Sequence, residues 1–321
     1  MVENTQSRTD EDNQNEVAYT VTVPTTPQAW LHLLDGVVHF AENTQRLSVS
    51  VARAIHDRLV NRGEPTREVA DALHGKWLGH PLHPVLTDIT IGSFALGMVF
   101  DVLGWLPGGH NMRLTADKLT TVGTLAAIPT AITGMAEYSA IKQDAARYGA
   151  AHGLLNSAVL LCYVRSVAAR LTGHRAKAFF YSLVGLTLLG VSGWIGGELV
   201  YQHRVGVNHV PAGEIPDWTP AMALADLPEG EPMRVEANGV PVLLFRRGDE
   251  VSAINAVCSH AGGPLEEGRV VDGDCVECPW HQSVFNMRTG KVVHTPAVYN
   301  QPRYEVRLVD DQIEVRGTAA E

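Results

Sequence analysis

Cysteine is scarce in this sequence. Four cysteines occur in 321 residues, which is too few for a scaffold held by disulfides. Three of them, Cys258, Cys275 and Cys278, lie within one short stretch, whereas Cys162 lies in an apolar run. A secretory signal is also not visible, because the N-terminus is acidic and has no apolar core segment. In such a chain, clustered cysteines indicate metal ligation before disulfide formation.

Basic residues are in deficit as well. The chain carries 25 Lys and Arg against 35 Asp and Glu, a net charge of −10. Most of this charge is C-terminal, since the residues from Asp217 onward include 17 acidic and 9 basic side chains. No basic face is available for a nucleic acid, so we exclude that partner class. An acidic domain instead favours a redox protein partner with a basic docking face, through long-range electrostatic steering.

The N-terminal quarter changes character within its length. Residues 1–27 are polar and acidic, and their composition is typical of a disordered segment. Residues 28–76 have apolar residues at three- and four-residue steps, which predicts an amphipathic helical segment. Two interpretations of that segment remain open: it packs on the domain behind it, or it lies on lipid.

Long apolar runs dominate the middle of the chain. Four segments, roughly 85–106, 119–136, 153–171 and 178–197, are rich in Leu, Val, Ala, Gly and Ile. The second and fourth have 18 and 20 uncharged residues in a row, enough to cross the ~30 Å hydrocarbon core. Asp88 and Asp101 weaken the first segment, and Arg165 and Arg170 the third, so a soluble bundle is the alternative. We predict a four-helix transmembrane domain over residues 77–203.

The C-terminal third has the pattern of an all-β domain. Residues 204–222 contain Pro211, Pro216 and Pro220 and predict a semi-rigid linker. Short β-type runs follow at 243–245, 251–257, 270–278 and 304–317, separated by turn residues. The last run alternates on both sides of Asp310 and Asp311, which predicts a hairpin. We expect a β domain over residues 223–321.

Two short motifs in the β domain carry metal-binding chemistry. Cys258-Ser-His260 and Cys278-Pro-Trp-His281 each supply one thiolate and one imidazole. A 2Fe–2S cluster with two cysteines on one iron and two histidines on the other needs this set of four ligands. Two Cys and two His also suit tetrahedral zinc, but zinc fingers space their ligands differently.

The run from Cys258 to Lys291, CSHAGGPLEEGRVVDGDCVECPWHQSVFNMRTGK, resembles Rieske proteins. The resemblance covers about residues 217–317 and implies an electron carrier. Gly263 and Trp280 stand where respiratory Rieske subunits have two further cysteines, so no disulfide joins the loops. Ser283 stands where high-potential members have a hydroxyl donor to the cluster, but Phe285 replaces the tyrosine that often follows. The resemblance is therefore nearer to the ferredoxins of aromatic-ring dioxygenase systems, and too few residues follow for an oxygenase domain.

The middle segment also resembles a known family. The runs GHPLHPVLTDITIGSF, GMAEYSA, AHGLLN and GGELVYQHRVGV are similar to a poorly characterised family of bacterial four-helix membrane domains. Its match covers about residues 75–207. The resemblance implies membrane location and redox partnership, so the expected fold class is an all-α four-helix transmembrane bundle followed by an all-β Rieske domain.

Polar residues of this bundle gather at one membrane face if the four spans alternate in direction. They are His80, His83, Asp88, Glu137, His152, Glu198 and His203. We expect His152 and His203 to be the best pair of ligands for a haem b, because antiparallel neighbours bring them to similar depth. His80 and His83 cap that site or replace one ligand. A second metal, a quinone site and the absence of any cofactor are the alternatives.

These features predict a membrane-anchored electron-transfer protein. It would pass single electrons between a soluble redox partner and a redox group in or near the bundle. A quinone oxidoreductase using the His/Glu face, and a redox sensor, are the competing hypotheses. Basic residues divide almost evenly between the two membrane faces, so the positive-inside rule decides little. We expect a multi-pass protein of the bacterial plasma membrane with both termini and the Rieske domain in the cytoplasm.

Overall fold

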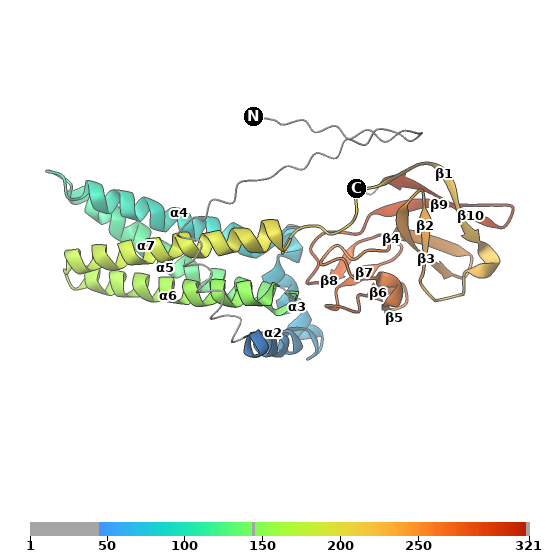
Figure 1. Ribbon diagram of the computed structural model, residues 1–321, viewed down its shortest axis with the longest axis horizontal. Helices are drawn as coiled ribbons and strands as arrows, with labels where there is room; N and C mark the ends of the chain where they lie inside the picture. Colours follow the sequence, from blue (N-terminus) through green and yellow to red (C-terminus); the bar gives the residue numbers. More distant parts are fainter. Residues whose placement is uncertain (1–44, 143–144, 319–321) are drawn as a thin grey trace, which may run out of the picture.

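The computed structural model describes residues 45–142 and 145–318, and the predicted disordered segment 1–27 lies outside them. Figure 1 shows an elongated molecule with a bundle of long helices at one end and a β domain at the other. Shorter helices lie at the end of the bundle that faces the β domain (Figure 1).

The two shorter helices are α2 (Gln45–Val60) and α3 (Glu64–His74). Helix α3 begins with Pro65 in its first turn, where a missing N–H is harmless. It ends at Gly75, whose φ of 87° closes the last turn with backbone bonds to Ala72 and Asp71. Helix α2 contacts α5 and α6, and α3 contacts α5 and strand β8. Of the two interpretations of this segment, packing on a neighbouring domain is the one observed over residues 45–74.

The bundle consists of α4 (Leu82–Leu103), α5 (His110–Ser139), α6 (Ala146–Leu171) and α7 (Arg175–Gly197), which continues as a π-helix η2 (Glu198–Gln202). Helix α4 packs along α5, and α6 packs along α7. All four are long and apolar enough to cross a membrane. Their outward surfaces carry large apolar side chains on every helix, including Leu96, Leu125, Leu161 and Leu183. A continuous apolar exterior of this kind fits lipid rather than water.

Charged residues inside the bundle pair with one another. Arg170 is almost fully buried and donates to both carboxylate oxygens of Asp101, one of them at 2.9 Å. Its Nη1 also lies 2.8 Å from Asp117, which in turn pairs with Arg175. One residue comes from each of the four helices. Of the charges that weakened two of the predicted spans, Asp101 and Arg170 therefore compensate each other, as buried charges must.

The β domain contains two antiparallel sheets. The larger has the strand order β1-β10-β9-β4-β3-β2, and the smaller has the order β5-β6-β7-β8. The strands of the larger sheet are β1 (Glu214–Ala223), β2 (Met233–Ala237), β3 (Val240–Arg247), β4 (Glu250–Asn255), β9 (Arg303–Val309) and β10 (Gln312–Thr318). Those of the smaller sheet are β5 (Arg269–Val271), β6 (Cys275–Glu277), β7 (Val284–Asn286) and β8 (Val292–His294).

The predicted linker is too long. Strand β1 begins at Glu214 and pairs with β10, so the linker prediction is wrong from that residue onward. Pro216 and Pro220 indicated a linker, but both are compatible with β1. This strand lies at the edge of its sheet, where proline costs no ladder hydrogen bond. The predicted hairpin is confirmed: Asp310 and Asp311 join β9 to β10 with φ of 50° and 63°.

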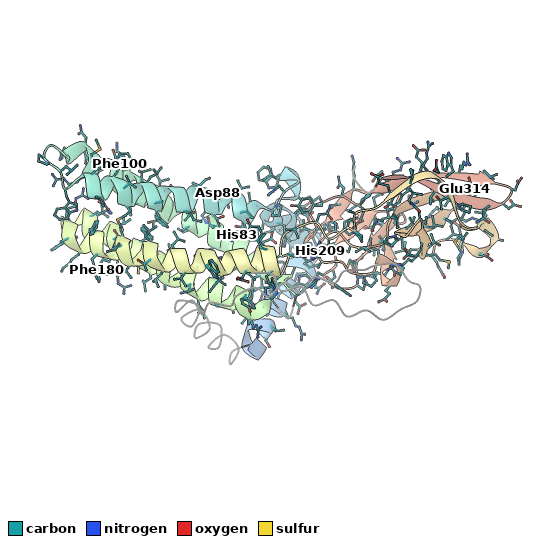
Figure 2. The ribbon with its side chains drawn as sticks, turned by 45° about the horizontal axis from the view of Figure 1, so that its top comes forward. His83, Asp88, Phe100, Phe180, His209 and Glu314 are labelled. Atoms are coloured by element: carbon teal, nitrogen blue, oxygen red, sulfur yellow. The ribbon has the colours of Figure 1, made fainter. Side chains whose placement is uncertain are left out.

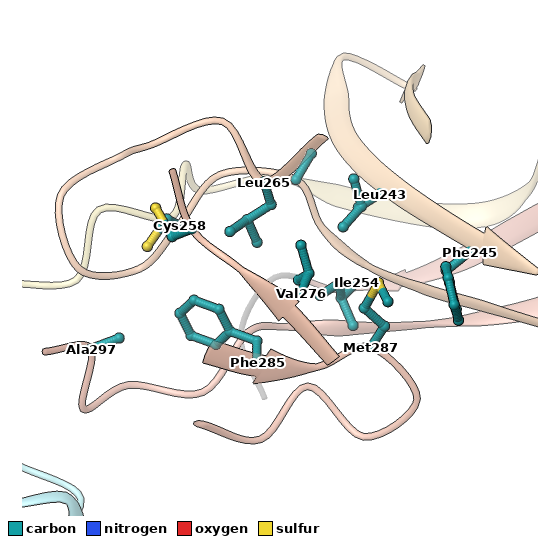
Figure 3. Packing of buried hydrophobic residues seen from close by; sticks show 11 residues of the cluster. Leu243, Phe245, Ile254, Cys258, Leu265, Val276, Phe285, Met287 and Ala297 are labelled. Atoms are coloured by element: carbon teal, nitrogen blue, oxygen red, sulfur yellow. The ribbon is translucent and has the colours of Figure 1, made fainter. Parts of the chain in front are cut away.

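A hydrophobic cluster fills the β domain beside the metal-binding motifs. Leu243, Ile254, Leu265, Val276 and Phe285 are each at most 1 % exposed and belong to one cluster. Figure 3 shows these side chains between the strands, with Cys258 at one end of the cluster. The motif loops thus rise from a rigid, well-packed base.

Candidate metal centre and its contact with the bundle

The two motifs form loops with the same backbone hydrogen bonds. In the first loop, Cys258 N–H donates to Gly263 O at 2.8 Å and Gly262 N–H donates to Cys258 O at 2.9 Å. In the second, Cys278 N–H donates to Ser283 O at 2.8 Å and Gln282 N–H donates to Cys278 O at 3.0 Å. Each loop turns through a positive φ at its fifth residue, 81° at Gly262 and 61° at Gln282.

The four predicted ligands gather into two pairs of like donors. Cys258 and Cys278 are 1 % and 2 % exposed, and their sulfur atoms share a hydrogen bond. The His260 and His281 rings have centroids 5.0 Å apart and planes at 86°. Nδ1 of His281 is buried without a hydrogen-bond partner among the described residues. Coordination to a two-iron cluster would satisfy that nitrogen. Such a cluster needs two thiolates and two imidazoles as ligands, and these four residues supply them.

Electrostatics favour the protonation states that iron needs. Burial lowers the pKa of His260 well below its ordinary value and that of His281 to about 4. Both rings are therefore neutral at physiological pH, with a lone pair for a metal. The hydrogen bond with Cys258 lowers the pKa of Cys278 to about 7, and the same contact raises the pKa of Cys258. The donor set is thus arranged for metal rather than for free thiol chemistry.

Two further residues shape the centre, Gly263 and Ser283. A Cβ on Gly263 would lie 2.8 Å from Sγ of Cys278 and 3.2 Å from the Trp280 ring, so this glycine permits the close approach of the two loops. Ser283 is fully buried, and its Oγ accepts a 2.9 Å bond from Ala297 N–H. Its own hydroxyl hydrogen therefore remains to be donated elsewhere.

The β domain is attached to α3 through Asp71. This carboxylate is 9 % exposed and accepts bonds from Lys76 at 2.7 Å, from Thr295 N–H and Oγ1 at 2.9 and 3.0 Å, and from His294 Nδ1 at 3.2 Å. Lys76 also donates to Val293 O. Three of these donors belong to the β domain, so one side chain of the helical part holds the loop after β8. We call these interactions the Asp71 contact.

Two histidines that sequence reasoning missed lie beside the motif loops. His74 is 2 % exposed, interacts electrostatically with His260, and has its Nδ1 3.3 Å from Glu137 Oε1. His209 follows the bundle; its N–H donates to Ser259 O at 3.0 Å, and its ring contacts the His260 backbone. Neither belongs to a spaced motif, so no local pattern identified them. Because His74 belongs to α3 and His209 follows the bundle, the side of the centre that carries His260 and His281 faces the bundle.

The predicted membrane-face residues do not all come together. His83 interacts electrostatically with Glu137 and with His152, inside the bundle. His203 instead packs on the Tyr148 ring at 4.6 Å, one turn before His152. His80 is exposed and lies edge-on to Tyr299. Two acidic residues of the predicted set are not buried. Asp88 is exposed, and Glu198 is half-buried in the π-helix.

A β domain in which two equivalent loops each present one cysteine and one histidine defines a class of two-iron electron carriers. The chain belongs to the Rieske family: a family model described as Rieske [2Fe-2S] domain matches residues 217–305. A second family model, described as predicted membrane protein (DUF2231), matches residues 79–209. The predicted fusion of these two units is confirmed.

The relatives are ferredoxin subunits. The anthranilate 1,2-dioxygenase ferredoxin subunit of Burkholderia cepacia is 41 % identical over 99 residues, 31 % of this chain and 91 % of that protein. The 3-phenylpropionate/cinnamic acid dioxygenase ferredoxin subunit of Escherichia coli (strain K12) is 40 % identical over 88 residues, 27 % of this chain and 82 % of that protein. The solved ferredoxin of carbazole 1,9a-dioxygenase from Nocardioides aromaticivorans IC177 is 32 % identical and covers 31 % of this chain and 97 % of its own, with a TM-score of 0.30. The C-terminal domain is accordingly a ferredoxin-type 2Fe–2S domain with an electron-transfer role.

Proposed function

We propose that the chain is a membrane-anchored Rieske protein that exchanges single electrons between a soluble redox partner and a redox group in the helical bundle. Cys258 and Cys278 hold the inner iron, and His260 and His281 hold the outer iron. When bound, the cluster supplies a one-electron couple. The protein supplies the hydrophobic core beneath the loops, the neutral imidazoles and the Ser283 hydroxyl, which adjust the reduction potential of the cluster.

One observation carries the bundle side of the proposal. His260 lies within electrostatic range of His74. Nδ1 of His74 lies 3.3 Å from Glu137 Oε1, and Glu137 is within electrostatic range of His83 inside the bundle. This run of neighbouring polar groups between the centre and the bundle supports electron exchange with a group in the bundle. The Asp71 contact keeps the domain in this arrangement.

The soluble partner is a redox protein of the kind that serves ferredoxins. The relatives are named as subunits of dioxygenase systems, which supports a reductase or an oxygenase as partner. Because the region from Asp217 onward has 17 acidic and 9 basic residues, a basic docking face on that partner is favoured. The apolar exterior of α4–α7 contacts membrane lipid.

The N-terminal part supports one orientation in the membrane. Helices α2 and α3 lie with the Rieske domain at one end of the bundle (Figure 1). A polar, acidic N-terminal region is easier to leave in the cytoplasm than to translocate, so we place this end on the cytoplasmic side of a bacterial plasma membrane. Labelling of a cysteine added at the C-terminus by a membrane-impermeant reagent in intact cells would contradict this orientation.

The ligand assignment is tested by electron paramagnetic resonance on the detergent-purified chain. Reduction should produce the rhombic signal of a Rieske cluster, and His281→Ala should abolish it. Cys275→Ser is the matched control, because Cys275 is a buried cysteine of β6 only three residues before the second motif. A signal that survives in His281→Ala, or disappears in Cys275→Ser, would show that the assignment is wrong.

A further inference from the structure

The two helical hairpins of the bundle are built in the same way around one histidine each. In the α4–α5 hairpin, His83 Nδ1 lies 2.9 Å from the carbonyl oxygen of Thr130. In the α6–α7 hairpin, His152 Nδ1 lies 2.9 Å from the carbonyl oxygen of Ser192. Each histidine is near the start of the first helix, and each carbonyl belongs to the second helix of the same hairpin.

A glycine lies against each of these rings, four residues after the accepting carbonyl. A Cβ on Gly134 would come within 2.8 Å of His83 Cε1, and a Cβ on Gly196 within 3.2 Å of His152 Cε1. Any larger residue at either position would displace the ring. Both histidines are therefore held in the same way, by a hydrogen bond to a backbone carbonyl and by packing against a glycine.

The equivalence continues along the bundle. Eleven residues after the histidines stand Phe94 and Tyr163, whose rings stack with centroids 3.4 Å apart and planes within 4°. A Cβ on Gly123 would meet the Phe94 ring at 2.7 Å, and a Cβ on Gly185 would meet the Tyr163 ring at 2.9 Å. The hairpins thus face each other as approximate copies, and their equivalent positions meet in the middle of the bundle.

This arrangement brings the two histidines to the same level, at the end of the bundle that faces the Rieske domain. Figure 2 shows His83 toward that end, whereas Phe100 and Phe180 lie toward the opposite end. His83 and His152 are close enough to interact electrostatically. The structure therefore pairs His152 with His83, through the equivalence of the hairpins, rather than with His203.

The hydrogen bonds fix which ring nitrogen is available. Because Nδ1 of each histidine faces a carbonyl oxygen, it must carry the hydrogen, and Nε2 then has the lone pair. Asn156 Nδ2 lies 3.0 Å from Nε2 of His152 and donates to that lone pair, so this amide has to turn away before Nε2 binds a metal. An imidazole whose Nδ1–H donates to a backbone carbonyl is oriented and made more basic for metal ligation at Nε2.

We propose that His83 and His152 are the two axial ligands of a haem iron between the hairpins. A bare metal ion needs more than two protein donors, and this pair supplies two imidazoles only. A porphyrin supplies the other four nitrogens, so two imidazoles complete the coordination. The proposal deepens the function proposed above, because it names the redox group in the bundle. One electron leaves the reduced cluster and reduces ferric to ferrous iron, and no bond or proton transfer is required.

The test is haem content of the full chain, expressed with ample haem and purified in mild detergent. We expect a Soret band and about one haem per chain by the pyridine haemochrome assay. His83→Ala and His152→Ala should each lower the haem content at least tenfold, and His83→Met should shift the bands by changing one ligand. His110→Ala is the matched control, because His110 is exposed at the opposite end of the bundle. His203→Ala should also retain the band.

The Rieske signal of each variant reports folding separately from haem binding. Wild-type protein that has the Rieske signal but no Soret band overturns the haem proposal and leaves the tethered carrier intact. An extra metal without porphyrin, or quinol turnover without a Soret band, also overturns it. A band that survives in His83→Ala and His152→Ala but is lost in His203→Ala shows that the ligand pair is wrong. Loss of the Rieske signal in the wild type instead contradicts the proposed function itself.

Discussion

Replacing Asp71 by Ala removes the carboxylate that joins α3 to the Rieske domain. The wild-type side chain accepts four hydrogen bonds, at 2.7, 2.9, 3.0 and 3.2 Å. A hydrogen bond to a charged group contributes about 1.5–3 kcal/mol, and removing one partner of a buried ion pair costs about 3–5 kcal/mol. Since some donors find water once exposed, we take about 3–5 kcal/mol as the total loss. The ratio of docked to undocked domains should then fall roughly 100- to 4,000-fold.

Limited proteolysis of residues 204–213, the segment between the bundle and β1, measures this loss. Cleavage of Asp71→Ala should be at least about tenfold faster than that of the wild type, with the Rieske signal unchanged. Glu64→Ala is the matched control, because Glu64 reaches His294 from the same helix at 3.6 Å but is 65 % exposed. Equal cleavage rates for the two variants would refute the account of the Asp71 contact.

The same contact should depend on pH. Burial alone would raise the pKa of Asp71, but hydrogen bonds from Lys76 and Thr295 outweigh it and hold the pKa below its ordinary value. A carboxyl group with a depressed pKa stabilises the docked state above its free pKa of about 3.9. That stability is lost as the pH falls through the docked-state pKa. Cleavage of the wild type should therefore be constant from neutral pH to about pH 4 and rise below it, whereas Asp71→Ala should respond little.

Three further outcomes are expected. Ser283→Ala should lower the cluster midpoint potential by roughly 40–130 mV, the equivalent of one lost hydrogen bond of about 1–3 kcal/mol; an unchanged value in protein-film voltammetry would exclude Ser283 as a donor. Arg170→Met should destabilise the bundle by about 3–5 kcal/mol, seen as earlier thermal unfolding in detergent, while Arg165→Met, at an exposed site, should have little effect; similar midpoints would contradict the pairing. His260→Ala should eliminate the Rieske spectrum while the Soret band proposed above persists, and joint loss would indicate misfolding.

The candidate centre could be read from the sequence because its information is local. Each loop places its cysteine and histidine two or three residues apart, and the backbone bonds that shape it span five residues. The hairpin at Asp310 and Asp311 was predictable for the same reason. Cys275, which belongs to neither motif, is buried in β6 at 6 % exposure.

Contacts between distant parts of the chain were not predictable. Asp71 meets Thr295 across 224 positions, and nothing in either neighbourhood points to the other. The choice of His203 as a partner for His152 rested on equal depth in antiparallel helices. Depth is a property of one helix, whereas the orientation of a ring depends on neighbours such as the Ser192 carbonyl. The sequence therefore predicts that these histidines gather at one end of the bundle, but it does not decide the orientation of their rings.

The Asp101–Arg170 pair has a consequence for how such a bundle can exist. Both residues stand 18 positions after the histidine of their hairpin, so they occupy the same place in the two copies. Two identical hairpins, associating as a homodimer, would oppose two aspartates or two arginines at that place. Like charges in a lipid-surrounded core would repel each other and find no compensation. The divergence of this position thus makes each hairpin complementary to the other, and a single chain that encodes both keeps the two opposite charges together.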